Sequence, residues 1–269
     1  MLKDITLGQY FPGKSVIHRL DPRAKLLLLI VYIVALFLAK SWFSYALVLV
    51  FLVTVTVLGK IPFKAMTRGL KPMLIFIIFT AILNLFYTKG EQPPLIDWWI
   101  FTIYAKGIRT AIFMVLRIMM LICGTFLLTY TTSPIALTDA LEQLLNPLKK
   151  LHVPVHEFAM MMSIALRFIP TLIEETDKII SAQKARGADF ETGSIIRRAK
   201  ALIPILVPLF ISAFRRADEL ATAMECRCYH GGEGRTRLKV LRYSSLDLIA
   251  FLAGALILAG VIVLRHYGL

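Results

Sequence analysis

The chain has 269 residues, of which 58% are hydrophobic, and a formal net charge of +14, with a mean hydropathy of +0.72. Soluble domains are about 45–50% apolar, so this composition excludes an ordinary soluble domain. Because the apolar residues come in blocks, we predict an all-α integral membrane protein. The positive charge then fits residues that flank membrane spans better than a nucleic-acid interface. Three cysteines without framework spacing argue against a disulfide-stapled exported domain.

Apolar blocks predict about five transmembrane helices, over residues 26–39, 43–58, 72–87, 108–130 and 246–264. The first three are shorter than the roughly 20 residues that a helix needs to cross the hydrocarbon. Flanking lysines that reach the interface would extend them. We expect no cleavable signal peptide, because no apolar stretch opens the chain. Arg117 falls inside the fourth span, and we expect it to lie near a boundary, face protein or pair with a partner subunit.

The lysines and arginines of the short loops predict the orientation of these spans. Basic residues crowd the segment before the first span and the loop between the second and third, whereas only Lys40 separates the first span from the second. We therefore predict a cytoplasmic N-terminus and, after five spans, an outer C-terminus. Aromatic residues typical of membrane interfaces fall at the predicted outer boundaries, namely Trp42, Trp98, Trp99 and Tyr104.

Residues 133–243 differ in kind from the spans, because they are rich in both basic and acidic residues and yet keep apolar runs. This pattern predicts amphipathic helices that do not cross the membrane. We accordingly divide the chain into an N-terminal arm with four spans (1–132), a cytoplasmic helical segment (133–243) and a last span (244–269). Helix start and stop residues predict helices over about 134–151, 154–186, 194–202 and 204–229, with a kink at Pro170 and with Gly187 and Gly231 as the ends of the two long ones.

The two long helices of this segment resemble each other at an offset of 41 positions. The matched pairs are Thr171 with Ser212, Ile173 with Phe214, Asp177 with Asp218, Ile179 with Leu220, Ala182 with Ala223 and Arg186 with Arg227. An arginine in the last turn of a helix is favoured by the helix dipole. It also offers a rigid fork of donors to a carboxylate or to backbone carbonyls, and nearby alanines allow close approach of a partner. The two tips are therefore our candidate docking elements.

At these residues the chain resembles a known family. Ala185-Arg186-Gly187, within residues 181–190, looks like the first Ala-Arg-Gly motif of the transmembrane coupling proteins of energy-coupling factor (ECF) transporters, the CbiQ-like EcfT family. The run Gly8–Ser15, the run His18–Lys25 and the run Ala217–Glu225 are similar to further parts of that family. The resemblance covers essentially the whole chain.

The resemblance implies a non-catalytic subunit of a vitamin or micronutrient importer in a bacterial cell membrane. Two ABC-type ATPase subunits would receive the two helix tips, through Ala185, Arg186 and Gly187 on one and Cys226, Arg227 and Cys228 on the other. A separate substrate-binding membrane protein, the S component, would pack on the long helices, with Met160, Met161 and Met162 as expected contacts. We expect ATP to be used by the partner subunits, and no cofactor, metal or nucleic acid to be bound by this chain.

The second tip departs from the family pattern, because Cys226-Arg227-Cys228 stands where a second Ala-Arg-Gly is common. Cysteine in place of glycine loses left-handed backbone freedom. We therefore expect Gly231 to end this helix instead, and the two tips to dock differently.

Several other signals leave alternatives open. The Met-rich stretch after Phe158 could be plain core or an adaptable partner surface. His152 and His156 are spaced as metal ligands on a helix, but Pro154 between them predicts that they straddle a helix start. Cys226, Cys228 and His230 could form a soft-metal or redox cluster. A membrane-embedded enzyme and a stand-alone secondary carrier are the competing functions. The lack of acid clusters and of a metal motif disfavours the enzyme, and the scarcity of charged residues in the spans together with the large non-spanning segment disfavours the carrier.

Overall fold

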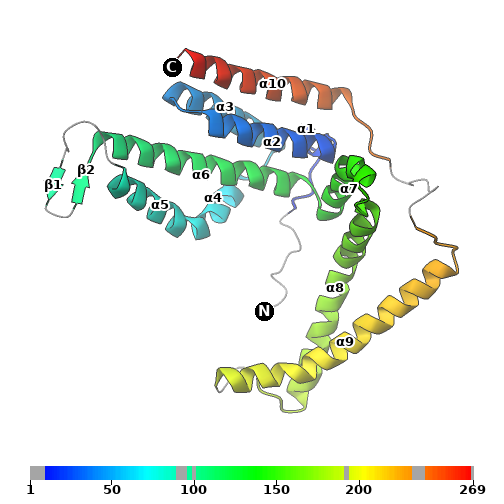
Figure 1. The fold of residues 1–269 in the computed structure, drawn as a ribbon. Coiled ribbons are helices and arrows are strands. Elements are labelled where there is room, and N and C mark those ends of the chain that lie inside the picture. The colour runs from blue at the N-terminus through cyan, green and yellow to red at the C-terminus, as the bar shows by residue number, and fades with distance from the viewer. Residues whose placement is uncertain (1–9, 89–95, 99–100, 191–193, 232–239, 268–269) are drawn as a thin grey trace. The chain divides into compact units, whose positions relative to one another are not determined.

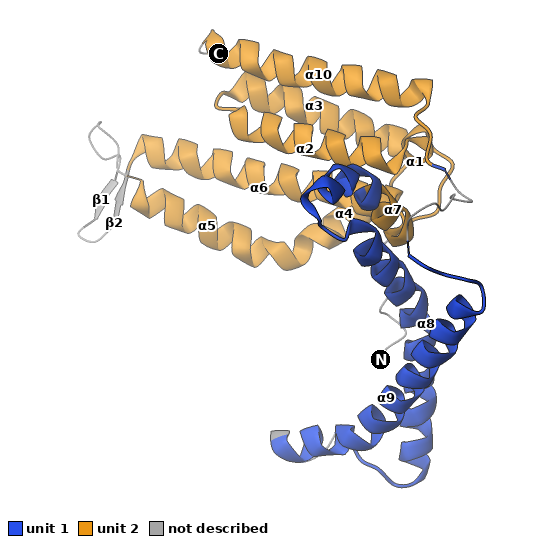
Figure 2. Cartoon of the chain, turned by 45° about the vertical axis from the view of Figure 1, so that its right-hand side comes forward, with its two compact units in different colours: residues 1–7, 141–240 blue, residues 8–140, 241–269 orange. Residues whose placement is uncertain are grey.

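The computed structural model describes residues 10–88, 96–98, 101–190, 194–231 and 240–267 (Figure 1). Two compact units are formed, a membrane bundle of residues 8–140 and 241–269 and a two-helix unit centred on residues 141–240 (Figure 2). The elements of the bundle are α1 (Val16–Arg19), α2 (Pro22–Leu38), α3 (Trp42–Gly59), α4 (Phe63–Leu70), η1 (Lys71–Met73), α5 (Leu74–Tyr87), β1 (Ile96–Trp98), β2 (Phe101–Ile103), α6 (Ala105–Thr131) and α10 (Ser245–His266). α7 (Pro134–Leu145) leads into the two-helix unit, which holds η2 (Asn146–Leu151), α8 (Val155–Ala185) and α9 (Ile195–Glu225).

The bundle is built around α2, α3, α6 and α10, with α5 packed on α6. Its core gathers apolar and aromatic side chains from these four helices, among them Tyr32, Leu36, Val48, Met120 and Val261. Small residues let the helices approach closely, as is usual in membranes. A Cβ on Gly124 would come within 2.5 Å of the Tyr32 ring, so this position of α6 requires glycine. The Tyr32 hydroxyl completes the contact by donating to the Met120 carbonyl at 2.9 Å.

Five helices among the described residues are long and apolar enough to cross a membrane, which confirms the predicted class of multi-pass membrane protein. They are α3, the stretch from Phe63 to Tyr87, α6, α8 and α10. Four of them hold the second to fifth predicted spans. The first predicted span, 26–39, lies in α2, which has 17 residues and packs against α6 and α10. α8 is the remaining candidate, although charged residues fill its second half.

Arg117 shows how the bundle accommodates a charge inside a span. Its Nε donates to the Tyr45 hydroxyl at 3.0 Å and its Nη2 donates to the Ala39 carbonyl at 3.2 Å. The guanidinium also lies 5.4 Å from the centre of the Phe37 ring. Of the three placements that the sequence left open, the structure shows that Arg117 faces protein, where hydrogen bonds replace those of water.

A network of hydrogen bonds joins the start of α2 to the start of α10. Asp247 is 1% exposed and accepts hydrogen bonds from the backbone N–H of Asp21 at 2.8 Å and of Ser244 at 2.7 Å. Asp21 in turn pairs with Arg23 at 2.8 Å, and Arg23 lies 4.1 Å from the centre of the Tyr243 ring. Burial would raise the pKa of the Asp21 carboxyl, but the hydrogen bonds from Arg23 outweigh it, so the pKa is lowered.

The structure differs from the sequence predictions of secondary structure in two places. β1 and β2 form an antiparallel hairpin that no pattern predicted, with Ile96 opposite Ile103. The predicted boundary at Pro204 does not exist, because α9 continues through Pro204 and Pro208 as one helix. α8 also runs through a proline, Pro170, and this helix was predicted to continue past it. A proline removes one backbone donor and bends a helix, but neighbouring turns can hold the helix together, and Figure 1 shows α9 changing direction along its length.

Two groups of predicted residues fall outside the description. Gly8 and Gln9 of the N-terminal run, and Trp99 at the predicted outer boundary, are not among the described residues. The three-part division at residues 132 and 243 stays a prediction. The boundaries between the two compact units fall after residues 140 and 240 of the chain.

Candidate functional site

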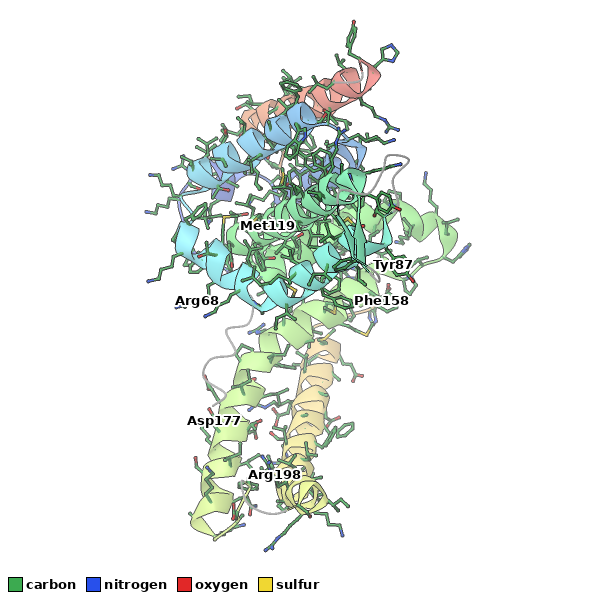
Figure 3. All side chains as sticks on the ribbon, turned by 90° about the vertical axis from the view of Figure 1, so that its left-hand side faces the viewer. Arg68, Tyr87, Met119, Phe158, Asp177 and Arg198 are labelled. Carbon is green, nitrogen blue, oxygen red and sulfur yellow. The ribbon has the colours of Figure 1, made fainter. Side chains whose placement is uncertain are left out.

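The two long helices of the two-helix unit run antiparallel to each other. Near one end the Tyr229 hydroxyl donates to the Met160 sulfur at 3.1 Å. Further along α8, Glu175 meets Ser212 and Arg216 of α9. Figure 3 shows α8 and α9 side by side over this length. Along these contacts the residue numbers increase on α8 and decrease on α9. The C-terminal tips of the two helices therefore point in opposite directions.

The central contact is a charge pair between equivalent positions of the repeat. Arg216 Nη2 lies 3.1 Å from Glu175 Oε2, and the two residues are 41 positions apart, which is the offset that also relates Arg186 to Arg227. The Ser212 hydroxyl donates to the other carboxylate oxygen, and this bond, with Arg216, lowers the pKa of Glu175. The pair therefore marks an approximate twofold axis between α8 and α9, which sequence reasoning missed although the offset of 41 could have suggested it.

Both arginines lie equally far from this axis. Arg186 comes eleven positions after Glu175, and Arg227 comes eleven positions after Arg216. At 1.5 Å per residue each tip extends about 16 Å beyond the central pair. The two-helix unit thus presents one arginine at either end, at matched distances.

The first tip ends in the common glycine-dependent helix stop. Gly187 has φ +86°, its N–H donates to the Lys184 carbonyl at 2.9 Å, and the Ala188 N–H donates to the Gln183 carbonyl at 3.0 Å. These two bonds are the Schellman pattern, which satisfies the last free carbonyls of a helix. Arg186 is consequently the cap residue, and its side chain is exposed at the very end of α8.

The second tip has the same backbone despite its different sequence. Cys228 has φ +55°, its N–H donates to the Glu225 carbonyl at 2.8 Å, and the Tyr229 N–H donates to the Met224 carbonyl at 3.0 Å. The expectation that Gly231 ends this helix was therefore wrong, because Cys228 itself adopts the left-handed conformation. A non-glycine residue pays roughly 1–3 kcal/mol for that conformation, which the two hydrogen bonds offset.

The two tips match residue by residue at the offset of 41. Gln183, Lys184, Arg186, Gly187 and Ala188 correspond to Met224, Glu225, Arg227, Cys228 and Tyr229 in the hydrogen-bond pattern. The alanines near the two tips are all exposed, namely Ala182, Ala185, Ala221 and Ala223. A Cβ on Gly187 would meet nothing within 4 Å. Cys226 and Cys228 are exposed and form no disulfide. Both tips are thus open surfaces that can approach a partner.

The three methionines on α8 point to different surroundings. Met160 is half-buried and accepts the hydrogen bond from Tyr229, so it belongs to the contact between the two helices. Met161 and Met162 are each 53% exposed, and neighbouring Phe158 is 57% exposed. The plain-core interpretation of this stretch therefore applies to Met160, while the other two face outward.

The candidate metal ligands are not brought together. His152 is the cap of η2 with φ +59°, and His156 lies in the first turn of α8, so the two straddle a helix start as predicted. His156 Nδ1 lies 2.8 Å from Glu142 Oε1. Over the part of the chain that the structure describes, no three histidine, cysteine or acidic residues are grouped as metal ligands.

Residues 8–15 have the sequence pattern of a phosphate-binding loop, Gly-x4-Gly-Lys-Ser. Such a loop follows a strand and opens a long helix. Here α1 has only four residues, the Ser15 hydroxyl is bonded to His18 Nδ1 at 2.7 Å, and the Phe11 N–H donates to the Tyr130 carbonyl at 3.0 Å. This arm is thus tied to α6 and to its own short helix, which differs from the context of an ATP site.

Known proteins are similar to this chain over most of its length. A family model described as "Cobalt transport protein", CbiQ, matches residues 13–238, which include both tips. The "Energy-coupling factor transporter transmembrane protein EcfT" of Clostridium kluyveri is 56% identical over 266 residues, covering 99% of this chain and 98% of the relative. The chain belongs to the CbiQ/EcfT family. The protein of the same description from Bacillus subtilis is 50% identical over 247 residues, covering 92% and 93%.

Membership in the EcfT family confirms the resemblance that the tip motifs suggested. The family is one of transmembrane proteins of ECF transporters, which agrees with the five long apolar helices. The roles of Arg186, Arg227 and the methionines remain predictions.

Proposed function

We propose that this chain is the coupling subunit of an ECF-type importer. Motion that ATP drives in two cytoplasmic ATPase subunits passes through α8 and α9 to a separate substrate-binding membrane protein. The observation that carries the proposal is the pair of matched, exposed arginine tips at equal distances from the Glu175–Arg216 pair. Two equivalent tips suit two related grooves on a pair of ATPase subunits, one tip in each.

Each tip is suited to docking by its shape and its charge. The Schellman end exposes the arginine while the helix carbonyls stay satisfied. The guanidinium can then bond a carboxylate or backbone carbonyls in the ATPase groove. Because Arg186 and Arg227 extend from the ends of 31-residue helices, each about 46 Å long, a displacement of a tip is transmitted along a stiff element.

The substrate-binding subunit is proposed to contact the exposed apolar surface of the same helices. Met161 and Met162 supply flexible thioethers, which adapt to several partners. Exposed Phe210 and Phe214 extend the apolar surface on α9. The transported vitamin or micronutrient would be selected by that partner, and this chain would bind neither substrate nor ATP.

The topology proposed for the chain places α8 and α9 in the cytoplasm of a bacterial cell, with α2 as the first span. Basic residues crowd the N-terminal segment and the α3–α5 connection, and such residues stay inside. α8 is assigned to the cytoplasm because Glu174, Glu175 and Asp177 would be costly in lipid, and because its tip must meet the ATPases.

The test is assembly and uptake with both arginines reversed. The double variant Arg186→Glu, Arg227→Glu places a negative charge opposite the hydrogen-bond acceptors of both grooves. We therefore expect copurification of the ATPases and coupled uptake to fall at least about tenfold. Arg265→Glu, in the last turn of α10, is the matched control and should keep both. Assembly and uptake at the level of the control in the double variant would remove the proposed role.

A further inference from the structure

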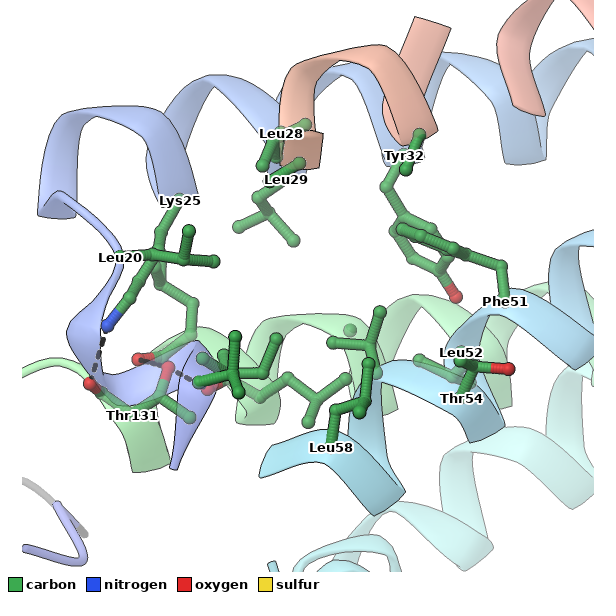
Figure 4. A pocket seen from close by; sticks show the side chains of 18 of the residues that line it. Leu20, Lys25, Leu28, Leu29, Tyr32, Phe51, Leu52, Thr54, Leu58 and Thr131 are labelled. Carbon is green, nitrogen blue, oxygen red and sulfur yellow. Dashed lines mark hydrogen bonds between the residues drawn. The ribbon is translucent and has the colours of Figure 1, made fainter. Parts of the chain in front are cut away.

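The membrane bundle contains an apolar cavity of about 310 Å³ (Figure 4). This volume is at the lower end of the roughly 300–1,000 Å³ that small-molecule sites occupy. Its walls come from α1, α2, α3, α6 and α10, and leucine, isoleucine, valine and alanine dominate them. Lys25, Tyr32, Thr54 and Thr131 also line it, and the three hydroxyls donate to backbone carbonyls. The cavity belongs to the membrane bundle and the helix tips to the two-helix unit, and the coupling function proposed above does not use the cavity.

The cavity opens sideways between α3 and α10. Near Leu47 these helices are in close contact, since a Cβ on Gly260 would lie 3.0 Å from Leu47 Cδ2. At the other end of the same pair, the cavity residues Leu58 and Ile249 are 48% and 61% exposed. In a membrane-spanning bundle the space beside these side chains is lipid, so an acyl chain can enter from the bilayer.

Positive charge surrounds the α1 end of the cavity. Lys14, Arg19 and Lys60 are exposed there, and the end of α3 touches α1, with Ile17 Cγ1 3.9 Å from a Cβ built on Gly59. Lys25 lines the cavity, and its ammonium donates to the Thr131 carbonyl at 2.8 Å.

The acids at this end are already engaged. Asp21 pairs with Arg23, and Asp247 accepts two backbone N–H groups. Their negative charge is therefore matched by these partners, and an anion that reaches the α1 end meets a surplus of cations.

We propose that this cavity binds one acyl chain of an anionic phospholipid, whose phosphate lies against Arg19 and Lys60 at the membrane surface. The apolar walls and the lateral opening match the acyl chain, and the exposed cations at the α1 end match the headgroup. Basic residues at a membrane surface attract anionic lipid by about 1 kcal/mol each. The bound lipid would fill the inner end of the bundle between α3 and α10, where these two helices part.

Native mass spectrometry of the purified full-length chain, with equimolar phosphatidylglycerol and phosphatidylcholine, tests the charge part. We expect phosphatidylglycerol to be retained at least tenfold more than phosphatidylcholine. In Arg19→Gln, Lys60→Gln the preference should fall about tenfold, whereas Lys40→Gln, Lys106→Gln, at the predicted outer ends of spans, should keep it. Equal retention of both lipids by the wild-type chain would overturn the proposal.

Cavity filling tests the acyl-chain part. Ala253 lines the cavity and Ala255, two residues on, is exposed on α10 without lining it. Ala253→Phe should abolish lipid retention and Ala255→Phe should not, with circular dichroism checking the fold and Ala250→Leu replacing Ala253→Phe if that variant does not fold. Retention equal in both variants excludes the site. ATPase assembly, measured on the same samples, should stay unchanged, which separates this result from the coupling proposal.

Discussion

At the scale of single residues, the most informative position is Cys228. Its left-handed backbone (φ +55°) is where the equivalent position of the first tip has glycine. Sequence reasoning treated the cysteine as a loss of the helix stop. Local hydrogen bonds to the Met224 and Glu225 carbonyls overrode that conformational preference, because leaving carbonyls unsatisfied also costs free energy.

Replacing Cys228 should measure this strain. Cys228→Gly removes the steric penalty of the Cβ in this conformation and should stabilise the second tip by about 1 kcal/mol. This gain corresponds to about fivefold greater protection of the amide from exchange. Hydrogen exchange at the Tyr229 N–H, which closes the stop, is the measurement. Cys228→Ala keeps the penalty and is the control. Equal protection in both variants would mean that the left-handed backbone is not strained.

At the scale of elements, the antiparallel pairing of α8 and α9 has a charge pair at its centre. Glu175 and Arg216 are partly exposed, at 26% and 38% for their side chains, so the pair is expected to contribute only about 0.5–1 kcal/mol. Its value lies in setting the register of the two helices, because it joins positions that the repeat makes equivalent. Helix periodicity predicted both helices but carried no information on which of their residues meet.

Neutralising this pair should loosen the register without unfolding either helix. With spin labels at positions 182 and 223, Glu175→Gln or Arg216→Gln should broaden the measured distance distribution. The charge swap Glu175→Arg, Arg216→Glu should narrow it again. Glu219→Gln, an exposed acid on α9, should change nothing. A swap that stays as broad as the single variants would show that the pair does not set the register.

The same contact predicts a pH dependence. Because the folded-state pKa of Glu175 is below its ordinary 4.5, the contribution of the pair is complete above about pH 4.5 and is lost as the pH falls through the lower folded value. The distance distribution should therefore be constant from pH 8 to 5 and broaden only below about 4.5. Glu175→Gln should remove this acid step.

At the scale of the whole molecule, topology decides whether the tips can meet ATPases. The native thiols Cys226 and Cys228 report it directly, because both are exposed. A membrane-impermeant maleimide should leave them unlabelled in intact cells and label them in inside-out vesicles. Lys106→Cys, in a variant without the native cysteines, should label in intact cells. The reverse pattern would contradict the orientation inferred from loop charges.

The sequence by itself determined the class of the protein, four of its long apolar helices, the two arginine tips and the family to which they point. These features follow from local composition and spacing, which any short window of the chain displays. Only the tertiary structure decided that α9 runs unbroken through two prolines, that Cys228 takes a glycine's conformation and that Glu175 meets Arg216. It also decided that residues of five helices line one cavity. Each of these depends on contacts between residues distant along the chain, or on a balance of backbone strain against hydrogen bonding that residue type alone does not reveal.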